Sequence, residues 1–204
     1  DNTCHFGINN LFADNGFEDD ETTRLYFPAD ANQLKGCLKS IIKDKGLRFV
    51  YSTRSACPYI LKEDGTPFYD ENYNFNSGKD EVIRKGSDGY VVSYGEMLYR
   101  SLDAVERLKQ EGFDVGLINK PTLNIWDTET LSILADAPFV LVVESQNTKS
   151  GLGSRFGNWL LKNGLSPKYD QMGTHCIGHG GLSEQVTHQG LDPADIKAKI
   201  EEMK

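Results

Sequence analysis

Between residues 89 and 145, short apolar runs alternate with segments whose apolar residues recur at helical spacing. Residues 89–94 (Gly-Tyr-Val-Val-Ser-Tyr) are mostly β-branched or aromatic, which is typical of a buried strand. From Glu96 to Glu111, apolar residues recur every three or four positions, so we predict a helix that ends at Gly112.

The alternation continues through two more strands. Residues 115–118 predict the second strand, a second helix opens at Asp127, and Phe139–Val143 is the most apolar run of the chain. Connections of a few residues between strand, helix and strand are typical of parallel strands joined by crossover helices. We therefore predict an α/β fold built on a mainly parallel sheet.

The first third of the chain predicts a strand at residues 24–27, a helix and a strand at residues 48–52. The helix starts at Asp30, a good N-cap, with Gln33 as its capping-box partner, and stops at Gly46. Four apolar residues are expected to face the core from this helix: Leu34, Leu38, Ile41 and Ile42. Because two strands are too few to close a sheet, we expect half of an α/β domain here.

Residues 55–89 are rich in Pro, Gly, Asn and Asp and are interpreted as a linker, whose aromatic residues indicate that it packs on the protein. At its end, residues 79–85 predict a strand that enters the second unit. Further along, a helix is predicted over residues 151–163, a strand over 167–172 and a last helix over 192–203.

Composition narrows the possible classes of protein. The formal net charge of −8 argues against non-specific nucleic-acid binding, and no apolar run approaches the ~20 residues of a membrane span. The four cysteines (Cys4, Cys37, Cys57 and Cys176) show no close pairing, which favours free thiols and a cytoplasmic location. Because the chain begins with Asp inside a polar segment, we expect a fragment whose earlier part is missing.

Residues 151–157 (Gly-Leu-Gly-Ser-Arg-Phe-Gly) follow the strongest strand and open a helix. Backbone N–H groups at such a position can hold a phosphate, so Gly151, Gly153 and Ser154 are candidate anion-binding residues. A dinucleotide fingerprint would follow the first strand of its unit instead. That mismatch favours the alternative, in which the glycines let the helix pack closely on the sheet.

His175, Cys176 and His179 lie close together, but no second Cys or His pair stands at zinc spacing. A glycine-rich surface loop is therefore favoured over a metal site, and His188 is interpreted as a surface histidine. Glu144 ends the third strand, where α/β folds place ligands, and is a candidate for a polar interface role.

Arg54 lies just past the strand at residues 48–52, near Cys57. It is the candidate for an anion contact, because a guanidinium can donate two parallel hydrogen bonds to a phosphate. A surface salt bridge is the alternative. His5 is either a proton carrier or a turn residue. No Ser-His-Asp order, carboxylate pair or P-loop stands out in the sequence.

Taken together, a series of local motifs resembles the C-terminal part of transketolase-like, thiamin-diphosphate-dependent enzymes. Residues 27–31 (Phe-Pro-Ala-Asp-Ala) resemble a helix start of that family, and residues 48–54 (Arg-Phe-Val-Tyr-Ser-Thr-Arg) resemble the closing strand of its pyrimidine-binding domain. Residues 89–104 resemble the start of its C-terminal domain, and residues 119–122 and 139–153 match two later segments. The resemblance covers nearly the whole chain.

The resemblance implies two α/β units. Residues 1–60 correspond to part of a pyrimidine-binding domain, and residues 61–80 to a linker. Residues 81–204 correspond to a transketolase C-terminal domain, whose mainly parallel sheet has one antiparallel strand and is flanked by helices.

The resemblance also implies a function, the transfer of a two-carbon ketol unit between sugar phosphates. Arg54 matches the family's substrate-phosphate arginine. His5 matches the catalytic histidine of a Thr-His-Asp loop, and Asp14 matches the substrate-binding aspartate of a Glu-Asp-Gly motif. A second histidine of that loop is absent, because residues 15–18 (Asn-Gly-Phe-Glu) stand in its place, which leaves the sugar-phosphate specificity open.

In this family, the glutamate that activates thiamin diphosphate and the domain that binds the diphosphate with Mg²⁺ lie upstream of residue 1. We therefore expect this chain to bind no cofactor and to be inactive alone. Its expected partner is the missing N-terminal portion or a partner subunit, within a homodimeric intact enzyme. The alternative is a stand-alone anion-binding module at residues 151–157, or a module for regulation or dimerisation, without catalysis.

Overall fold

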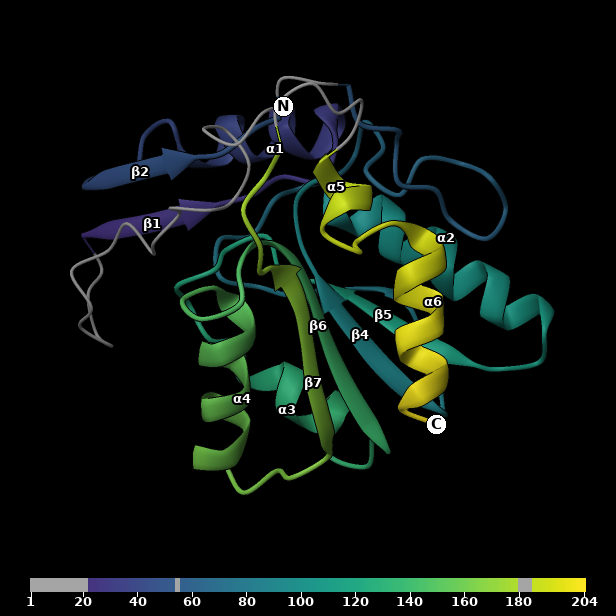
Figure 1. The fold of residues 1–204 in the computed structure, drawn as a ribbon. Coiled ribbons are helices and arrows are strands. Elements are labelled where there is room, and N and C mark those ends of the chain that lie inside the picture. The colour runs from purple at the N-terminus through teal and green to yellow at the C-terminus, as the bar shows by residue number, and fades with distance from the viewer. Residues whose placement is uncertain (1–21, 54–55, 180–184) are drawn as a thin grey trace.

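A computed structural model describes residues 22–53, 56–179 and 185–204. Over these residues, strands and helices alternate along the chain (Figure 1). In order, the elements are β1 (Thr23–Tyr26), α1 (Ala31–Ile41), β2 (Leu47–Val50), β3 (Glu81–Arg84), β4 (Gly89–Ser93), α2 (Met97–Gln110), β5 (Val115–Asn119), α3 (Thr128–Leu134), β6 (Phe139–Asn147), α4 (Leu152–Lys162), β7 (Lys168–Thr174), α5 (Gln185–His188) and α6 (Pro193–Glu202). None of the helices in this part of the chain combines the length and apolar character that crossing a membrane requires.

Within the described residues, β3 to β7 form a five-stranded sheet in the order β3-β5-β4-β6-β7. Strands β4 to β7 are parallel where they pair, and β3 pairs with β5 in the antiparallel direction. Helices α2, α3 and α4 each connect two successive parallel strands, because the chain must return to the same end of the sheet. The predicted α/β class and the mainly parallel sheet with one antiparallel strand are therefore confirmed.

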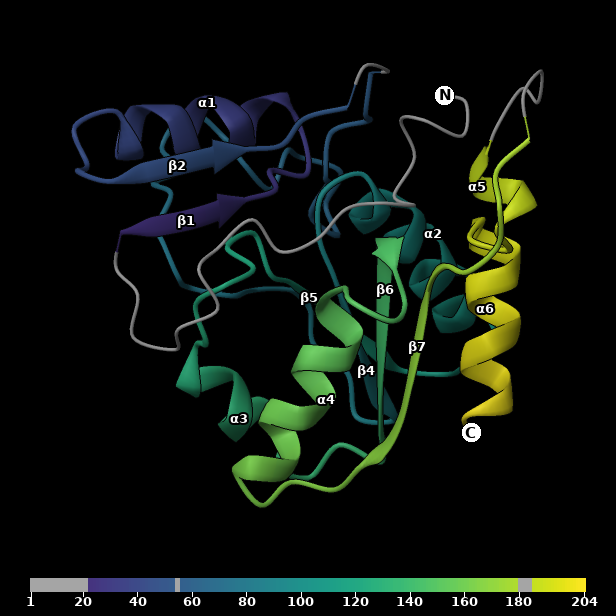
Figure 2. The same cartoon turned by 60° about the vertical axis from the view of Figure 1, so that its left-hand side comes forward.

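Helices cover both faces of this sheet, with α2 and α6 on one side and α3 and α4 on the other (Figure 2). Alternate residues of a strand point to opposite faces, so Val91 and Leu141 pack with α2 and α6. Val92 and Val142 pack with α3 and α4. Burial on both faces explains why β6 is a continuous apolar run and does not alternate with polar residues.

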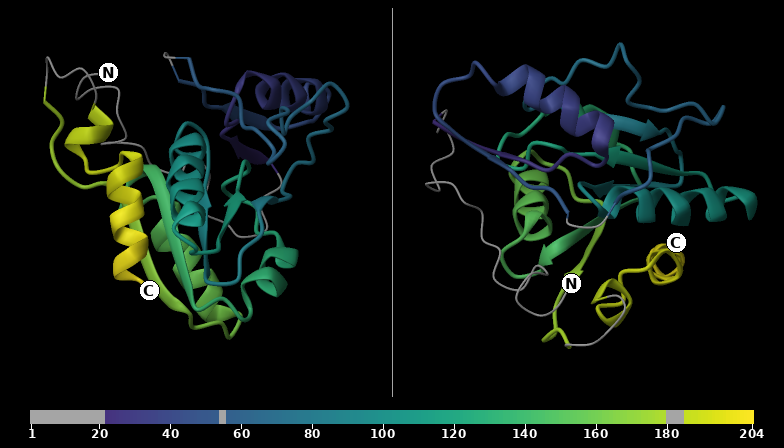
Figure 3. Two further views of the ribbon diagram at one scale, coloured as in Figure 1. Left: turned by 90° about the vertical axis from the view of Figure 1, so that its right-hand side faces the viewer. Right: turned by 90° about the horizontal axis from the view of Figure 1, so that it is seen from above.

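Strands β1 and β2 form a separate parallel pair that, together with α1, lies beyond the carboxyl ends of β6 and β7 (Figures 1 and 3). The segment that follows β5 is bonded along one edge of β1. The Phe27 N–H donates to the Pro121 carbonyl at 2.9 Å, and the Leu123 N–H donates to the Leu25 carbonyl at 3.0 Å. The Asn124 side chain accepts from the Leu25 N–H at 3.0 Å. These bonds join the small unit of β1, α1 and β2 to the larger sheet.

Helix α1 confirms the predicted cap, and the predicted apolar face only in part. The Asp30 carboxylate accepts from the Gln33 N–H at 2.8 Å, whereas the Gln33 side chain accepts from the Ala29 N–H and not from the cap residue. Leu38 and Ile42 were expected in the core, yet they are 46% and 78% exposed. The buried residues of the helix are Gln33, Cys37 and Ile41. The expectation is confirmed for Ile41 and was wrong for Leu38 and Ile42, because each of these follows a buried residue and so points about 100° away from it around the helix.

The segment between the two sheets packs closely on the protein, as its aromatic residues predict. Ile60 and Tyr69 are fully buried, and Phe75 is nearly so. The Asp30 carboxylate that caps α1 also accepts from the Ile60 N–H at 2.9 Å. The segment therefore contributes to the core and contacts both units.

Candidate functional site

Glu144, near the end of β6, has a fully buried side chain that accepts hydrogen bonds from three described residues. The Tyr94 hydroxyl donates at 2.8 Å, and the backbone N–H groups of Leu152 and Gly153 donate at 2.7 and 2.8 Å. Tyr94 follows β4, the neighbour of β6, and Leu152 begins α4, so the fold brings these groups to one edge of the sheet. The N-terminus of α4 thus holds a carboxylate of its own chain.

Burial governs the electrostatics of this site. It raises the pKa of the Glu144 carboxyl, while the two N–H groups and the Tyr94 hydroxyl act in the opposite direction. Burial, and then the charge of Glu144, raise the pKa of Tyr94 well above its ordinary value, so the phenol remains a donor. The arrangement fixes the end of β6 to the start of α4.

The predicted anion-binding residues have structural partners within the chain. A Cβ atom at Gly151 would lie 2.2 Å from the Glu144 carboxylate, and one at Gly153 would lie 2.2 Å from a side-chain oxygen of β7. The Ser154 hydroxyl donates to the Thr148 carbonyl at 2.6 Å. These contacts agree with the close-packing interpretation of the glycines. An external anion would have to share the N–H groups with Glu144, and anion binding here stays a prediction.

A second carboxylate, that of the half-buried Glu81 at the start of β3, connects the small unit to the larger sheet. The Gln33 amide donates to it from α1 at 2.8 Å, and the Asn119 amide donates from β5 at 3.0 Å. The Tyr69 hydroxyl donates at 2.9 Å, and the Tyr73 hydroxyl donates as well. Burial nevertheless raises the pKa of Glu81, because desolvation shifts this pKa upward by more than any single donor lowers it.

The raised pKa of Glu81 gives a testable pH dependence. Between the ordinary pKa of 4.5 and the higher folded-state pKa, the folded protein holds the proton that the unfolded chain has lost, so this group's contribution to stability falls as pH rises. We expect the destabilisation caused by Glu81→Gln to be smaller at pH 7.5 than at pH 5, measured by urea unfolding. Glu63→Gln is the control, because the ion pair with Lys109 lowers the pKa of this exposed acid below 4.5, so its effect should not change between pH 5 and pH 7.5. A Glu81→Gln effect that grows with pH would contradict the assignment.

An aromatic stack lies between the small unit and Glu144. The ring of Phe27, just after β1, stacks on that of Tyr51, just after β2, with centroids 4.2 Å apart. Phe27 also meets the Tyr94 ring edge-on at 5.1 Å. Because the Tyr94 hydroxyl bonds Glu144, the carboxyl ends of β1 and β2 are packed onto the same edge as the start of α4.

Three of the predicted site residues, His5, Asp14 and Arg54, lie outside the described residues, and their roles stay predictions. Glu144, the candidate for a polar interface role, lies near the end of β6, which is the third strand predicted from the sequence. Among the described residues, no group of three or more His, Cys, Asp or Glu side chains is placed to hold a metal ion. Cys176 and His188, which the sequence analysis considered separately, lie in contact beyond the end of β7.

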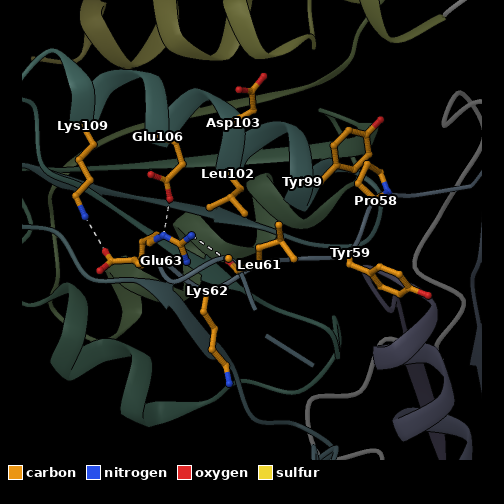
Figure 4. Close-up of a pocket in the computed structure, with 12 residues that line it drawn as sticks. Pro58, Tyr59, Leu61, Lys62, Glu63, Tyr99, Leu102, Asp103, Glu106 and Lys109 are labelled. Carbon is orange, nitrogen blue, oxygen red and sulfur yellow. Dashed lines mark hydrogen bonds and ion pairs between the residues drawn. The ribbon is translucent and has the colours of Figure 1, made fainter. Parts of the chain in front are cut away.

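Sequence reasoning missed a groove of about 480 Å³ between residues 58–65 and α2 (Figure 4). Four of its charged side chains form two ion pairs across the groove lining. Glu106 bonds Arg84 at 2.6 Å, and Glu63 bonds Lys109 at 2.6 Å. No local signal predicts this groove, because its two walls are far apart in the sequence.

Comparison with known proteins identifies the family. The model of the family described as "Transketolase, C-terminal domain" matches residues 78–196, which is more than half of the chain. A putative uncharacterized transketolase family protein of Sinorhizobium fredii is 29% identical over 182 residues, which cover 86% of this chain and 50% of that protein.

Two further relatives are named as parts of larger enzymes. A subunit of the apulose-4-phosphate transketolase of Actinobacillus succinogenes is 24% identical, over 95% of this chain and 60% of that protein. A putative transketolase C-terminal section of Methanocaldococcus jannaschii is 28% identical, over 87% of this chain and 54% of that protein. The chain thus spans between half and three fifths of the length of these relatives.

A solved structure described as a split gene transketolase, inactive beta4 tetramer, has the same fold, with a TM-score of 0.78. Its sequence is 22% identical, and the match covers 89% of this chain and 57% of that one. The matched fold, the relatives and above all the family model lead to one conclusion: this chain belongs to the transketolase C-terminal domain family.

Proposed function

We propose that this chain is the C-terminal section of a two-part transketolase-type enzyme, which transfers a two-carbon ketol unit between sugar phosphates. In this proposal, a second polypeptide carries the rest of the catalytic site. Support comes from the family match, from relatives named as a subunit and as a C-terminal section, and from their greater length. Residues 1–60 would then be part of a pyrimidine-binding domain, 61–80 a linker and 81–204 the C-terminal domain.

The observation that carries this proposal is the open edge of β2. The N–H groups of Leu47 and Tyr51 donate to carbonyls on the β1 side. Because the backbone alternates along a strand, the N–H and carbonyl groups of Arg48 and Val50 point away from β1. The other edge of β1 is already bonded by the segment after β5, so among residues 22–53 and 56–179 the small sheet has a free edge only beside β2.

Exposed apolar side chains gather on the same unit. Leu38 of α1 and Ile42, which caps the helix, are exposed, and Leu47 at the start of β2 is 56% exposed. Isolated exposed apolar residues are ordinary, but here all three belong to the small unit that carries the free edge of β2. A partner that adds a strand beside β2 would cover them, and so we place the docking surface for the second polypeptide here.

The cofactor is assigned to the assembled enzyme. Support for this assignment comes from relatives that are named as a subunit and as a C-terminal section of larger enzymes. Arg54 is proposed as the contact for the substrate phosphate, with Asp14 as a second substrate contact and His5 as the proton carrier. All three precede the linker, in the part of the chain that the second polypeptide would extend.

The test is reconstitution with the polypeptide that carries the remaining section in the source organism. We expect the chain alone to show neither thiamin diphosphate binding by calorimetry nor two-carbon transfer from a ketose phosphate to an aldose phosphate. Mixing the two polypeptides with thiamin diphosphate and Mg²⁺ should give a complex by light scattering and should restore transfer. Activity of the chain alone, or absence of any complex, would overturn the proposal.

A matched pair of variants tests the surface itself. Ile42→Glu should weaken the complex by at least about tenfold, because a charge buried at an interface without a partner costs more than about 1.4 kcal/mol. Leu161→Glu is the control, since Leu161 of α4 is similarly exposed (66%) but lies on the larger unit. Equal affinity of the two variants would place the docking surface elsewhere.

A further inference from the structure

Cys176, in the loop after β7, lies beside two histidines. Its Sγ is 3.7 Å from Nε2 of His188 on α5. The imidazole rings of His179 and His188 have centroids 4.5 Å apart. Because no three metal-ligating side chains in the described part of the chain converge on one point, this group is suited to proton transfer and not to chelation.

The buried side chain of Gln189 holds the sulfur in place. Its carbonyl oxygen accepts from the N–H groups of His175 and Cys176 at 3.0 and 3.2 Å, and its amide donates to the Cys176 carbonyl at 2.9 Å. The Cys176 thiol donates to the same oxygen at 3.4 Å. The loop backbone and the thiol are thus fixed relative to α5.

The carbonyl of Ile177 is a second group close to the same ring nitrogen of His188. It lies 3.1 Å from Nε2 of His188, and a carbonyl can only accept a hydrogen bond. When Nε2 takes the proton of the Cys176 thiol, it can donate to this carbonyl and face the resulting thiolate. The geometry therefore places a ring nitrogen of His188 where it can exchange a proton with the Cys176 sulfur.

The other described cysteines lack this arrangement. Cys37 is fully buried, and burial raises the pKa of its thiol to about 12. The Sγ of Cys57, which is half-buried, lies 3.4 Å from the Thr53 hydroxyl. Cys176 is half-buried as well, so Cys57 offers a comparison at similar accessibility.

We propose that Cys176 is a nucleophilic thiol that exchanges with small disulfides, with His188 accepting its proton. The Cys176 sulfur attacks one sulfur of the disulfide R–S–S–R, and the S–S bond breaks. One half stays on Cys176 as a mixed disulfide, and the other half leaves as a thiolate that takes the proton from His188. One disulfide is consumed and one thiol is released, so atoms and electrons balance. This activity goes beyond the proposed transfer reaction.

The experiment is incubation of the full chain with oxidised glutathione at pH 7.5, with the modification of each cysteine followed by peptide mass spectrometry. We expect Cys176 to react about ten times faster than Cys57, because an ordinary thiol is only a few per cent thiolate near neutral pH. His188→Asn should reduce this ratio to near one. His175→Asn is the control, because the ring nitrogen Nδ1 of His175 faces the Gly173 carbonyl and not the sulfur.

The ratio within the wild-type chain needs no variant, so misfolding of a variant cannot hide the answer. A Cys176 rate equal to or below that of Cys57 would overturn the proposal. So would an unchanged ratio in His188→Asn, if its circular dichroism matches that of the wild type. The failure of reconstitution with a second polypeptide would leave this result unaffected.

Discussion

Replacing Lys120 by Met is expected to lower the free energy of unfolding by about 3–5 kcal/mol at pH 7.5. Lys120 is fully buried, and its ammonium lies 3.1 Å from the carboxylate of Asp80, which is also buried. The ammonium also donates to the Ile125 carbonyl at 2.6 Å. Removing Lys120 leaves Asp80 as a buried charge with no cation beside it, which costs more than the lost bonds.

Urea unfolding measures this effect, and Lys62→Met provides the control. Lys62 forms an ion pair of similar length with Asp70, but both side chains are 43% exposed, so its removal should leave stability close to that of the wild type. The effect of Lys120→Met should shrink at pH 5, because burial already raises the pKa of Asp80 and the unpaired carboxyl can take up a proton. If the two substitutions lowered the free energy of unfolding equally, the buried Lys120 and Asp80 would not be coupled.

Replacing Glu144 by Gln is expected to cost about 2–4 kcal/mol, although the side chain keeps its size. One carboxylate oxygen accepts from the Tyr94 hydroxyl and the Leu152 N–H, and the other accepts from the Gly153 N–H. In either orientation, the new amide group points one N–H toward another N–H. One buried backbone donor is then left without an acceptor.

Thermal or urea unfolding of Glu144→Gln can be read against two variants. Tyr94→Phe removes one of the donors and should cost about 1 kcal/mol. Glu63→Gln changes an exposed acid and should leave stability close to that of the wild type. If Glu144→Gln behaved like Glu63→Gln, the carboxylate would not be what holds the start of α4.

Much of the five-stranded sheet could be predicted from the sequence, because its strands are buried on both faces and its helices carry clear caps. Asp127 and Asp192 both accept from backbone N–H groups at the helix starts that their sequence context predicts. The family resemblance implied one antiparallel strand without saying which one, and the pattern of β3 did not identify it. A short strand of mixed polar and apolar residues carries no signal of its direction.

The side-chain networks were beyond sequence reasoning for a physical reason. Glu81 is bonded by residues from α1, β5 and the segment between the sheets, so no local spacing predicts it. Glu144 was found only because it ends a parallel strand. The proximity of Cys176 to His188 depends on where α5 packs. Local patterns predict elements, whereas such sites depend on how distant elements meet.

The sealing of β1 by the segment after β5 has a consequence for self-association. A strand pair with two free edges can stack copies without limit, as growing fibrils do. Within this strand pair, only β2 keeps a free edge in the described part of the chain. If two copies paired edge to edge through β2, each would use its free strand edge. This unit could then form a dimer but could not add further copies to make a fibril.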